Sequence, residues 1–223
     1  MHQYLFFIGN FPIRLYGIFF SLGIISGCIT AYFLLKKDRR GWESHMFDLG
    51  LVIAFAGIVG GRLWDVFFFD WEYYHNHLLE IPYIWQGGMA IQGGIIFACI
   101  AAYFYLKKHQ IPVLPFADTV TPGIILGQAV GRIANFMNGD AFGHPTGQDF
   151  GLLYPDTTLA YHTYGAQPLW PAEVWECQGD LLIFVLLLWY GCKTRAEGTT
   201  FCLYIMFYSL LRFFLENYRG DYG

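Results

Sequence analysis

Six long segments of the chain consist mostly of apolar residues, and short polar or charged stretches separate them. They cover residues 15–35, 46–67, 87–105, 116–135, about 172–192 and 199–215. A helix needs about 20 residues to cross the hydrocarbon core of a bilayer. The pattern therefore predicts an all-α protein, a polytopic membrane helix bundle with about six transmembrane helices and a small extracytoplasmic head.

The basic residues predict how these segments are oriented. Three connections between the segments are basic, whereas residues 68–86 and 139–170 contain no Lys or Arg. The basic connections contain Lys36, Lys37, Arg39, Arg40, Lys107, Lys108, Lys193 and Arg195. Cytoplasmic loops carry an excess of Lys and Arg. We therefore expect a membrane protein with both termini outside, an aromatic loop at 68–86 along the interface, and a single membrane domain, 1–223, whose extracytoplasmic head is 139–170.

Composition excludes a soluble domain. Hydrophobic residues make up 56% of the chain and charged residues only 13%, whereas soluble proteins contain roughly 25% charged residues. We expect membrane lipids around the chain and no nucleic-acid partner. Five cysteines show no C-x-x-C spacing and are interpreted as core residues, not as metal ligands or disulfides. They are Cys28, Cys99, Cys177, Cys192 and Cys202.

One arginine lies at the end of the fourth apolar segment and needs a physical reason. A cation there costs about 2.5–3.5 kcal/mol on insertion scales, so it usually meets a counter-charge, water or an anionic ligand. Gln128, Arg132 and Asn135 share one helix face, and the polar turn 138–140 follows. Arginine suits a phosphate because of its permanent charge and planar donors. Extension of the side chain to lipid headgroups is the open alternative.

The sixth segment repeats this arrangement. Tyr208, Arg212, Glu216 and Arg219 recur at helical spacing, which predicts that they share a face. Glu216 could neutralise one guanidinium as an internal brace, but not both. We predict that Arg132 and Arg212 face one cavity near the outer leaflet and bind a phospholipid phosphate there. An anion gate or pore could use the same residues.

The residues that carry these features resemble a known family. Residues 131–143 read G-R-x-x-N-F-x-N-G-D-x-x-G, and this run is similar to the signature of bacterial phosphatidylglycerol:prolipoprotein diacylglyceryl transferases. The similarity continues, in the same order, at residues 14–17, 61–63, 85–94, 118–122, 171–176 and 212–219. Several separate motifs in one order make the resemblance specific.

The resemblance implies an inner-membrane enzyme without a metal or cofactor. It would move the diacylglyceryl group of phosphatidylglycerol to the lipobox cysteine of a prolipoprotein signal peptide, forming a thioether and releasing glycerol phosphate. By position, the catalytic residues would be Arg132, Arg212, Asp140 and Gln92. The substrate-binding residues would be Tyr16, Arg62, Asn135, Asn138, Gly143, Tyr208, Glu216 and Arg219.

The chain departs from the family pattern at several places. Gln92 stands where the family usually has a histidine that could take the thiol proton, and an amide is no base at useful pH. Asp140 replaces a glutamate, and Trp170 replaces a histidine. The chain ends soon after Arg219, so six spans are expected where the family has seven. His144 and His162 are alternative bases. A non-catalytic or altered-specificity relative that binds anionic phospholipid is the second hypothesis, and an anion transporter is the third.

Overall fold

The structure is a computed structural model that describes residues 4–8, 11–84, 87–191 and 196–221. The chain forms two compact units, Met1–Asp38 with Ala117–Gly223 and Arg39–Phe116. Several residues used in the sequence predictions lie outside the described residues: Trp85, Cys192, Lys193 and Arg195. The predicted single membrane domain remains a prediction.

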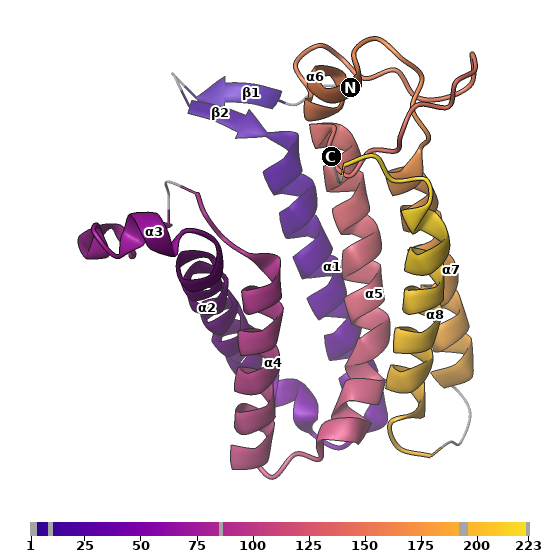
Figure 1. The fold of residues 1–223 in the computed structure, drawn as a ribbon. Coiled ribbons are helices and arrows are strands. Elements are labelled where there is room, and N and C mark those ends of the chain that lie inside the picture. Colours follow the sequence, from indigo (N-terminus) through magenta and orange to yellow (C-terminus); the bar gives the residue numbers. More distant parts are fainter. Residues whose placement is uncertain (1–3, 9–10, 85–86, 192–195, 222–223) are drawn as a thin grey trace. The chain divides into compact units, whose positions relative to one another are not determined.

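Six long helices lie where the apolar segments predict them (Figure 1). The first unit contains most of them, together with a short helix and a pair of strands. Its elements are the strands β1 (Tyr4–Ile8) and β2 (Phe11–Arg14) and the helices α1 (Leu15–Asp38), α5 (Val113–Asn138, with its first turn in the second unit), α6 (Leu159–Tyr164), α7 (Ala172–Gly191) and α8 (Thr199–Glu216). The second unit contains α2 (Met46–Trp64), α3 (Trp71–Tyr74), α4 (Ile91–Lys108) and short helical turns at Trp42–His45, Asp65–Phe69 and Leu78–Glu80.

In the described part of the chain, four helical stretches are long and apolar enough to cross a membrane by length and composition: Leu15–Asp38, Trp42–Phe69, Val113–Asn138 and Thr199–Glu216. The other two long helices, α4 and α7, also carry charged residues. Helix α4 ends in two lysines, and α7 carries three buried carboxyl groups. Large apolar side chains are exposed on several of the long helices, for example Phe55, Leu182 and Phe213. Lipid is the environment that suits them. The chain is a polytopic helical membrane protein.

Close backbone contact between α1 and α5 organises the first unit. A Cβ atom added to Gly27 would lie 2.7 Å from the carbonyl oxygen of Gly123, and one added to Gly23 would lie 2.8 Å from that of Gly127. Only glycine permits this approach, as small residues do at many transmembrane helix pairs. The glycines of the fourth apolar segment therefore bring α5 against α1.

Helices α5, α7 and α8 share an apolar core in which Ile125, Ile183 and Leu187 are buried. A carboxylate fixes the start of α8 in this arrangement. Asp118, on α5, accepts hydrogen bonds from the backbone N–H groups of Gly198 (2.7 Å) and Phe201 (2.9 Å). These N–H groups have no partner inside their own helix. Asp118 thus caps α8 from a neighbouring helix.

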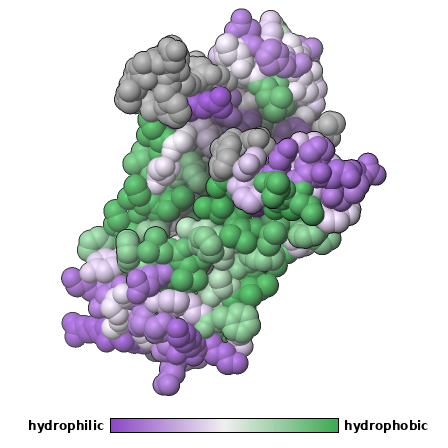
Figure 2. Space-filling model, turned by 90° about the vertical axis from the view of Figure 1, so that its left-hand side faces the viewer, coloured by the Kyte–Doolittle hydropathy of each residue, from purple (hydrophilic) through white to green (hydrophobic). Residues whose placement is uncertain are grey.

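The second unit is built on α2 and α4, which also meet through glycines. A Cβ atom added to Gly60 would lie 2.6 Å from the Gly93 carbonyl oxygen. Figure 2 shows hydrophobic side chains gathered in the middle of the displayed face and hydrophilic ones towards its ends. Such a distribution is typical of a surface in contact with lipid.

The segment between α5 and α7 forms a small head with its own core. Phe142, Tyr154, Ala160 and Leu169 are buried together there. Its outward location remains a prediction. The antiparallel pair β1–β2 was not predicted, because its apolar residues do not alternate with polar ones.

The interpretation of the cysteines as core residues is wrong for those described. Cys28, Cys99 and Cys202 are exposed, and Cys177 is half-buried. In a membrane protein an apolar residue need not be inside, because lipid covers it as well as protein does.

Candidate functional site

Two of the predicted arginines meet at one carboxylate. Arg132 projects from α5, and its Nη2 lies 2.8 Å from Oε1 of Glu176 on α7. Arg212 projects from α8, and its Nη1 lies 3.0 Å from the other oxygen, Oε2. Glu176 is 1% exposed. Three helices therefore bring two cations onto one buried anion, in the first unit.

A third arginine completes this arrangement. Helix α8 ends at Glu216, so Arg219 lies beyond the helix and not on the face predicted for it. Its guanidinium pairs with Asp221, and its Nη1 lies 3.8 Å from Glu176 Oε2. Arg212 also binds Glu216, at 3.1 Å. The predicted ion pair between Arg212 and Glu216 is therefore present. Glu176 lies against Arg212 and Arg219 as well as Arg132.

The polar turn after Arg132 holds a second carboxylate. Asp140 accepts hydrogen bonds from the side-chain amides of Asn135 (2.9 Å) and Asn138 (3.0 Å). Arg132 donates a long hydrogen bond of 3.5 Å to Asn135 Oδ1. A chain of polar contacts thus runs from Arg132 to Asp140. These contacts fix the predicted residues relative to one another.

Gly143 has a structural reason in this turn. A Cβ atom there would lie 2.3 Å from the Trp170 carbonyl oxygen and 2.8 Å from that of Tyr218. Its N–H donates to the Trp170 carbonyl (3.2 Å), and it pairs with Arg219 in an isolated antiparallel bridge. The glycine therefore lets the head and the segment after α8 approach each other, which places Arg219. Its predicted contact with substrate stays a prediction.

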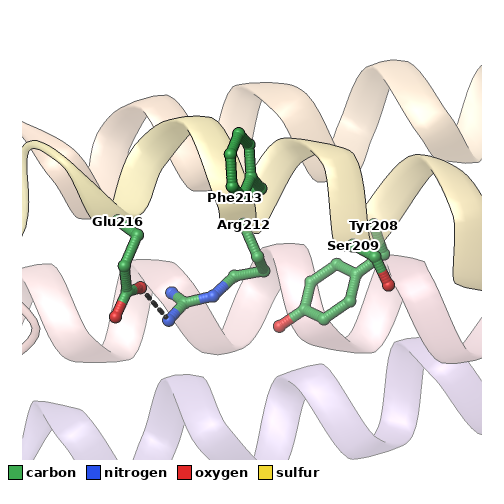
Figure 3. A pocket seen from close by; sticks show the side chains of 5 residues that line it. All are labelled: Tyr208, Ser209, Arg212, Phe213 and Glu216. Atoms are coloured by element: carbon green, nitrogen blue, oxygen red, sulfur yellow. Dashed lines mark hydrogen bonds and ion pairs between the residues drawn. The ribbon is translucent and has the colours of Figure 1, made fainter.

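An open pocket of ≈ 370 Å³ lies beside Arg212 on α8. Its lining consists of Tyr208, Ser209, Arg212, Phe213 and Glu216. Figure 3 shows Tyr208, Arg212 and Glu216 projecting from the same side of the helix, with Phe213 directed away from them. The pocket has a charged pair and an aromatic wall, which suit the boundary between a lipid headgroup and its chains.

Other predicted residues surround the arginines. The Tyr208 hydroxyl donates to Glu176 Oε1 at 3.5 Å. Tyr16, on α1, lies within electrostatic range of Arg132 and Asp140. Gln128, which was expected on the same helix face as Arg132, contacts α8 instead: its Oε1 accepts a hydrogen bond of 3.1 Å from the Tyr204 hydroxyl. The residue contributes to the packing of α5 against α8.

Two further carboxyl groups of α7 are fully buried. Asp180 follows Glu176 by one helical turn, and neither of its oxygens has a hydrogen-bond partner in the described part of the chain. Glu173 precedes Glu176 by one turn and accepts a hydrogen bond from Tyr154 of the head. Burial, with the neighbouring Glu173 carboxylate, raises the pKa of the Tyr154 phenol. This phenol is therefore a hydrogen-bond donor and not an acid at neutral pH.

Arg62 belongs to the second unit and is 4% exposed. All five of its N–H groups donate inside that unit. The acceptors are the carbonyl oxygens of Ile81, Gly87, Gly88 and Glu80 and the hydroxyl of Tyr74. A guanidinium has five donors, so this one has none left for a phosphate. The contacts favour a role in holding the loop before α4, and substrate binding by Arg62 stays an untested prediction.

Gln92 and the two histidines considered as bases differ in their surroundings. Gln92 is exposed in the first turn of α4, in the second unit. The ring nitrogens of His144 lie 2.9 Å and 3.1 Å from the carbonyl oxygens of Pro145 and Asn217. In this conformation neither nitrogen is available to a thiol. His162 is exposed on α6.

Sequence reasoning missed the role of Glu176. Glu173, Glu176 and Asp180 recur at i, i+3 and i+7 within an apolar segment, which places three carboxyl groups on one face. That spacing is a signal for a buried ionic site, because charged residues in such a segment need partners. Among the residues described, no group of three or more His, Cys, Asp or Glu could hold a metal ion.

The fold and the site define a polytopic helical membrane protein in which three arginines gather around one buried carboxylate. The chain belongs to the family described as "Prolipoprotein diacylglyceryl transferase", whose model matches residues 3–223.

Curated relatives with the name phosphatidylglycerol–prolipoprotein diacylglyceryl transferase are similar over nearly the whole chain. The protein of Clostridium botulinum (strain Langeland, type F) is 34% identical over 221 residues, which are 99% of this chain and 86% of the relative. That of Staphylococcus saprophyticus is 35% identical over 218 residues, 96% of this chain and 77% of the relative. That of Clostridium kluyveri is 35% identical over 216 residues, 97% and 84%.

Proposed function

We propose that the protein transfers the diacylglyceryl group of phosphatidylglycerol to a cysteine thiol of prolipoproteins. The family and its named members carry this activity in their names. The observation that supports the assignment of the site is the meeting of Arg132 and Arg212 at Glu176, from three different helices. A site that brings guanidinium groups together within the first unit suits a phosphate.

In the proposed reaction the cysteine thiol first loses its proton, because the thiolate is the nucleophile. Its sulfur forms a bond to the carbon of the diacylglyceryl group that carries the phosphate, and the bond from that carbon to the phosphate oxygen breaks. Glycerol phosphate leaves with the electron pair of the broken bond. Arg132 and Arg212 would hold the phosphate and stabilise the charge that develops on it.

The surrounding residues receive supporting roles in this proposal. Asn135, Asn138 and Asp140 would fix the turn that follows Arg132, and Tyr16 and Tyr208 would line the headgroup site. Glu216 and Arg219 would set the position of Arg212 and the charge around it. Gln92 would hydrogen-bond the thiol or the lipid but could not accept the thiol proton.

The location follows the same proposal. The protein would lie in the bacterial inner membrane, with the N-terminus and the head 139–170 outside and the lysine-rich connections inside. The protein substrate would present its lipobox cysteine at the outer leaflet.

The direct experiment is a transfer assay with purified protein. A lipobox peptide is incubated with phosphatidylglycerol in detergent, and the peptide mass is measured. We expect a gain of one diacylglyceryl group, and no gain with phosphatidylethanolamine, which bears no net charge. Retained binding of phosphatidylglycerol without any product would instead favour a non-catalytic lipid-binding relative.

A substitution at Gln92 tests how the thiol is activated. If the chain works without a local base, Gln92→His will raise kcat at neutral pH by about tenfold or more, because general bases typically contribute 10²–10⁴-fold. The gain should fall at pH values where the new imidazole is protonated. An unchanged kcat would mean that proton removal does not limit the reaction or that another group performs it. Gln92→Asn is the matched control.

A further inference from the structure

Glu176 receives the two arginines in the way that a phosphate would. Arg132 reaches Oε1 at 2.8 Å, and Arg212 reaches Oε2 at 3.0 Å, so each oxygen has its own guanidinium. The two non-bridging oxygens of a phosphodiester offer the same pair of acceptors, and arginine donates to carboxylates and phosphates with the same geometry. The carboxylate therefore occupies donors that an anionic headgroup would need.

The charges lead to the same conclusion. Arg132 and Arg212 are partly exposed, at 21% and 22% of their side chains, whereas the Glu176 side chain is 2% exposed. A headgroup can thus reach the arginines but would meet a fixed negative charge directly behind them. Two anions that share the same donors repel each other, and the repulsion is strong where water is scarce.

We propose that Glu176 is a resident counter-anion of the headgroup site, and that the phosphate of an anionic phospholipid binds by taking Arg132 and Arg212 from it. The proposal rests on the proposed function, because it concerns the same arginines. It assigns Glu176 as a positioning residue, which holds both guanidinium groups together while no lipid is bound.

The structure supplies a place for the displaced carboxylate. Two groups already lie near Glu176 at longer range: the Tyr208 hydroxyl, 3.5 Å from Oε1, and Arg219 Nη1, 3.8 Å from Oε2. Arg219 is held by Asp221 and is 8% exposed at its side chain. A small shift of Glu176 towards Arg219 would keep the carboxylate paired after the other two arginines turn to the phosphate. A buried carboxylate without any partner would be costly.

This exchange has a consequence for turnover. Glu176 competes with the lipid and also with the product glycerol phosphate, which carries a phosphate of greater charge. The counter-anion thus weakens binding of the headgroup and promotes release of the product. A site made of arginines alone would bind substrate and product more tightly without accelerating the reaction.

The test compares Glu176→Gln with Glu216→Gln. Both variants remove one negative charge that pairs with Arg212. Glu176 is buried and also pairs with Arg132, whereas the side chain of Glu216 is half-exposed (51%). We expect Glu176→Gln to lower KM for phosphatidylglycerol and the inhibition constant of glycerol phosphate by about tenfold, while kcat falls. Glu216→Gln should change both constants less. Binding of phosphatidylglycerol, phosphatidylethanolamine and free glycerol phosphate is measured in parallel, to distinguish a lipid from a soluble phosphate ester.

The opposite sign would overturn the proposal. If Glu176→Gln weakens binding of phosphatidylglycerol while thermal unfolding is unchanged, Glu176 only orients the arginines. If the glutamine variant does not fold, Glu176→Asp withdraws the carboxylate by one methylene, and it should tighten binding to a smaller extent; weaker binding by this variant would again contradict the exchange. Failure of the proposed function is seen separately, as absence of a diacylglyceryl peptide with the unaltered chain, because the binding measurements do not need turnover.

Discussion

At the scale of single residues, the three arginines within apolar segments are of two kinds. Arg62 is enclosed by five acceptors of its own unit and is 4% exposed. Arg132 and Arg212 keep about a fifth of their side chains exposed and pair with a carboxylate. Residue type alone does not separate the two kinds, since all three lie inside apolar segments. Their surroundings do, because a partly exposed guanidinium can meet a further anion, whereas an enclosed one cannot.

This difference predicts the effect of replacing Arg62 by lysine. An ammonium group has three donors and no planar fork, so Arg62→Lys leaves buried carbonyl groups unpaired, at a cost of about 1–3 kcal/mol each. We expect a clear fall in the thermal unfolding temperature and faster proteolysis in residues 74–84. The exposed Arg40, in the same unit, is the control, and Arg40→Lys should change little. Equal effects of the two substitutions would argue against the enclosing role of Arg62.

The same partners explain why the sequence predicts the arginines of the site but not its centre. The positions of Arg132 and Arg212 follow from their helical spacing and from the cost of a charge in an apolar segment. Glu176 could not be chosen from Glu173, Glu176 and Asp180 by sequence, because the rotation of α7 against α5 and α8 decides which carboxyl group meets the arginines. One of the three meets the head instead, through Tyr154.

At the scale of elements, glycines set the helix contacts. In α5, Gly123 and Gly127 lie directly against the backbone of α1, and Arg132 follows on the same helix. The apolar pattern predicts the six helices well, because their length and composition are dictated by the membrane. It does not predict which glycine meets which helix. It also misses β1 and β2, whose pairing depends on backbone hydrogen bonds and not on an alternating pattern.

A glycine substitution tests this packing. A Cβ atom at Gly123 would lie 2.4 Å from the Gly27 carbonyl oxygen, so Gly123→Ala must push α1 and α5 apart. Overpacking of this kind costs about 1–3 kcal/mol, and we expect a lower unfolding temperature together with reduced transfer activity. At Gly50, on α2, an added Cβ meets nothing within 4 Å. Gly50→Ala should therefore be neutral or slightly stabilising, and a similar loss in both variants would refute the contact.

At the scale of the whole molecule, the charges of the connections predict the orientation in the membrane. Along the sequence, the lysines at the end of α4 precede α5 and the head follows it, so a single span separates them. Family membership supports a bacterial membrane protein. The direction of insertion rests on the positive-inside rule.

Labelling in intact cells tests this orientation. Asp149, in the head, and Lys108, at the end of α4, are both exposed, so Asp149→Cys and Lys108→Cys offer matched thiols. We expect a membrane-impermeant maleimide to label the first variant above the level of the parent chain, and the second only after the cells are opened. The reverse pattern would place the head in the cytoplasm and invalidate the proposed access of the prolipoprotein.

The most direct measurement is kcat/KM for phosphatidylglycerol in Arg132→Gln, Arg212→Gln and the double variant. The control is Lys108→Gln, which removes an exposed charge at the end of α4, outside the proposed site. If both arginines hold one phosphate, each single substitution will lower kcat/KM by about 10²-fold or more. The double variant will lose much less than the product of the two losses, because the residues act as a unit, and Lys108→Gln will match the unaltered chain. Near-normal kcat/KM in either arginine variant, with the protein folded, would contradict the shared phosphate site.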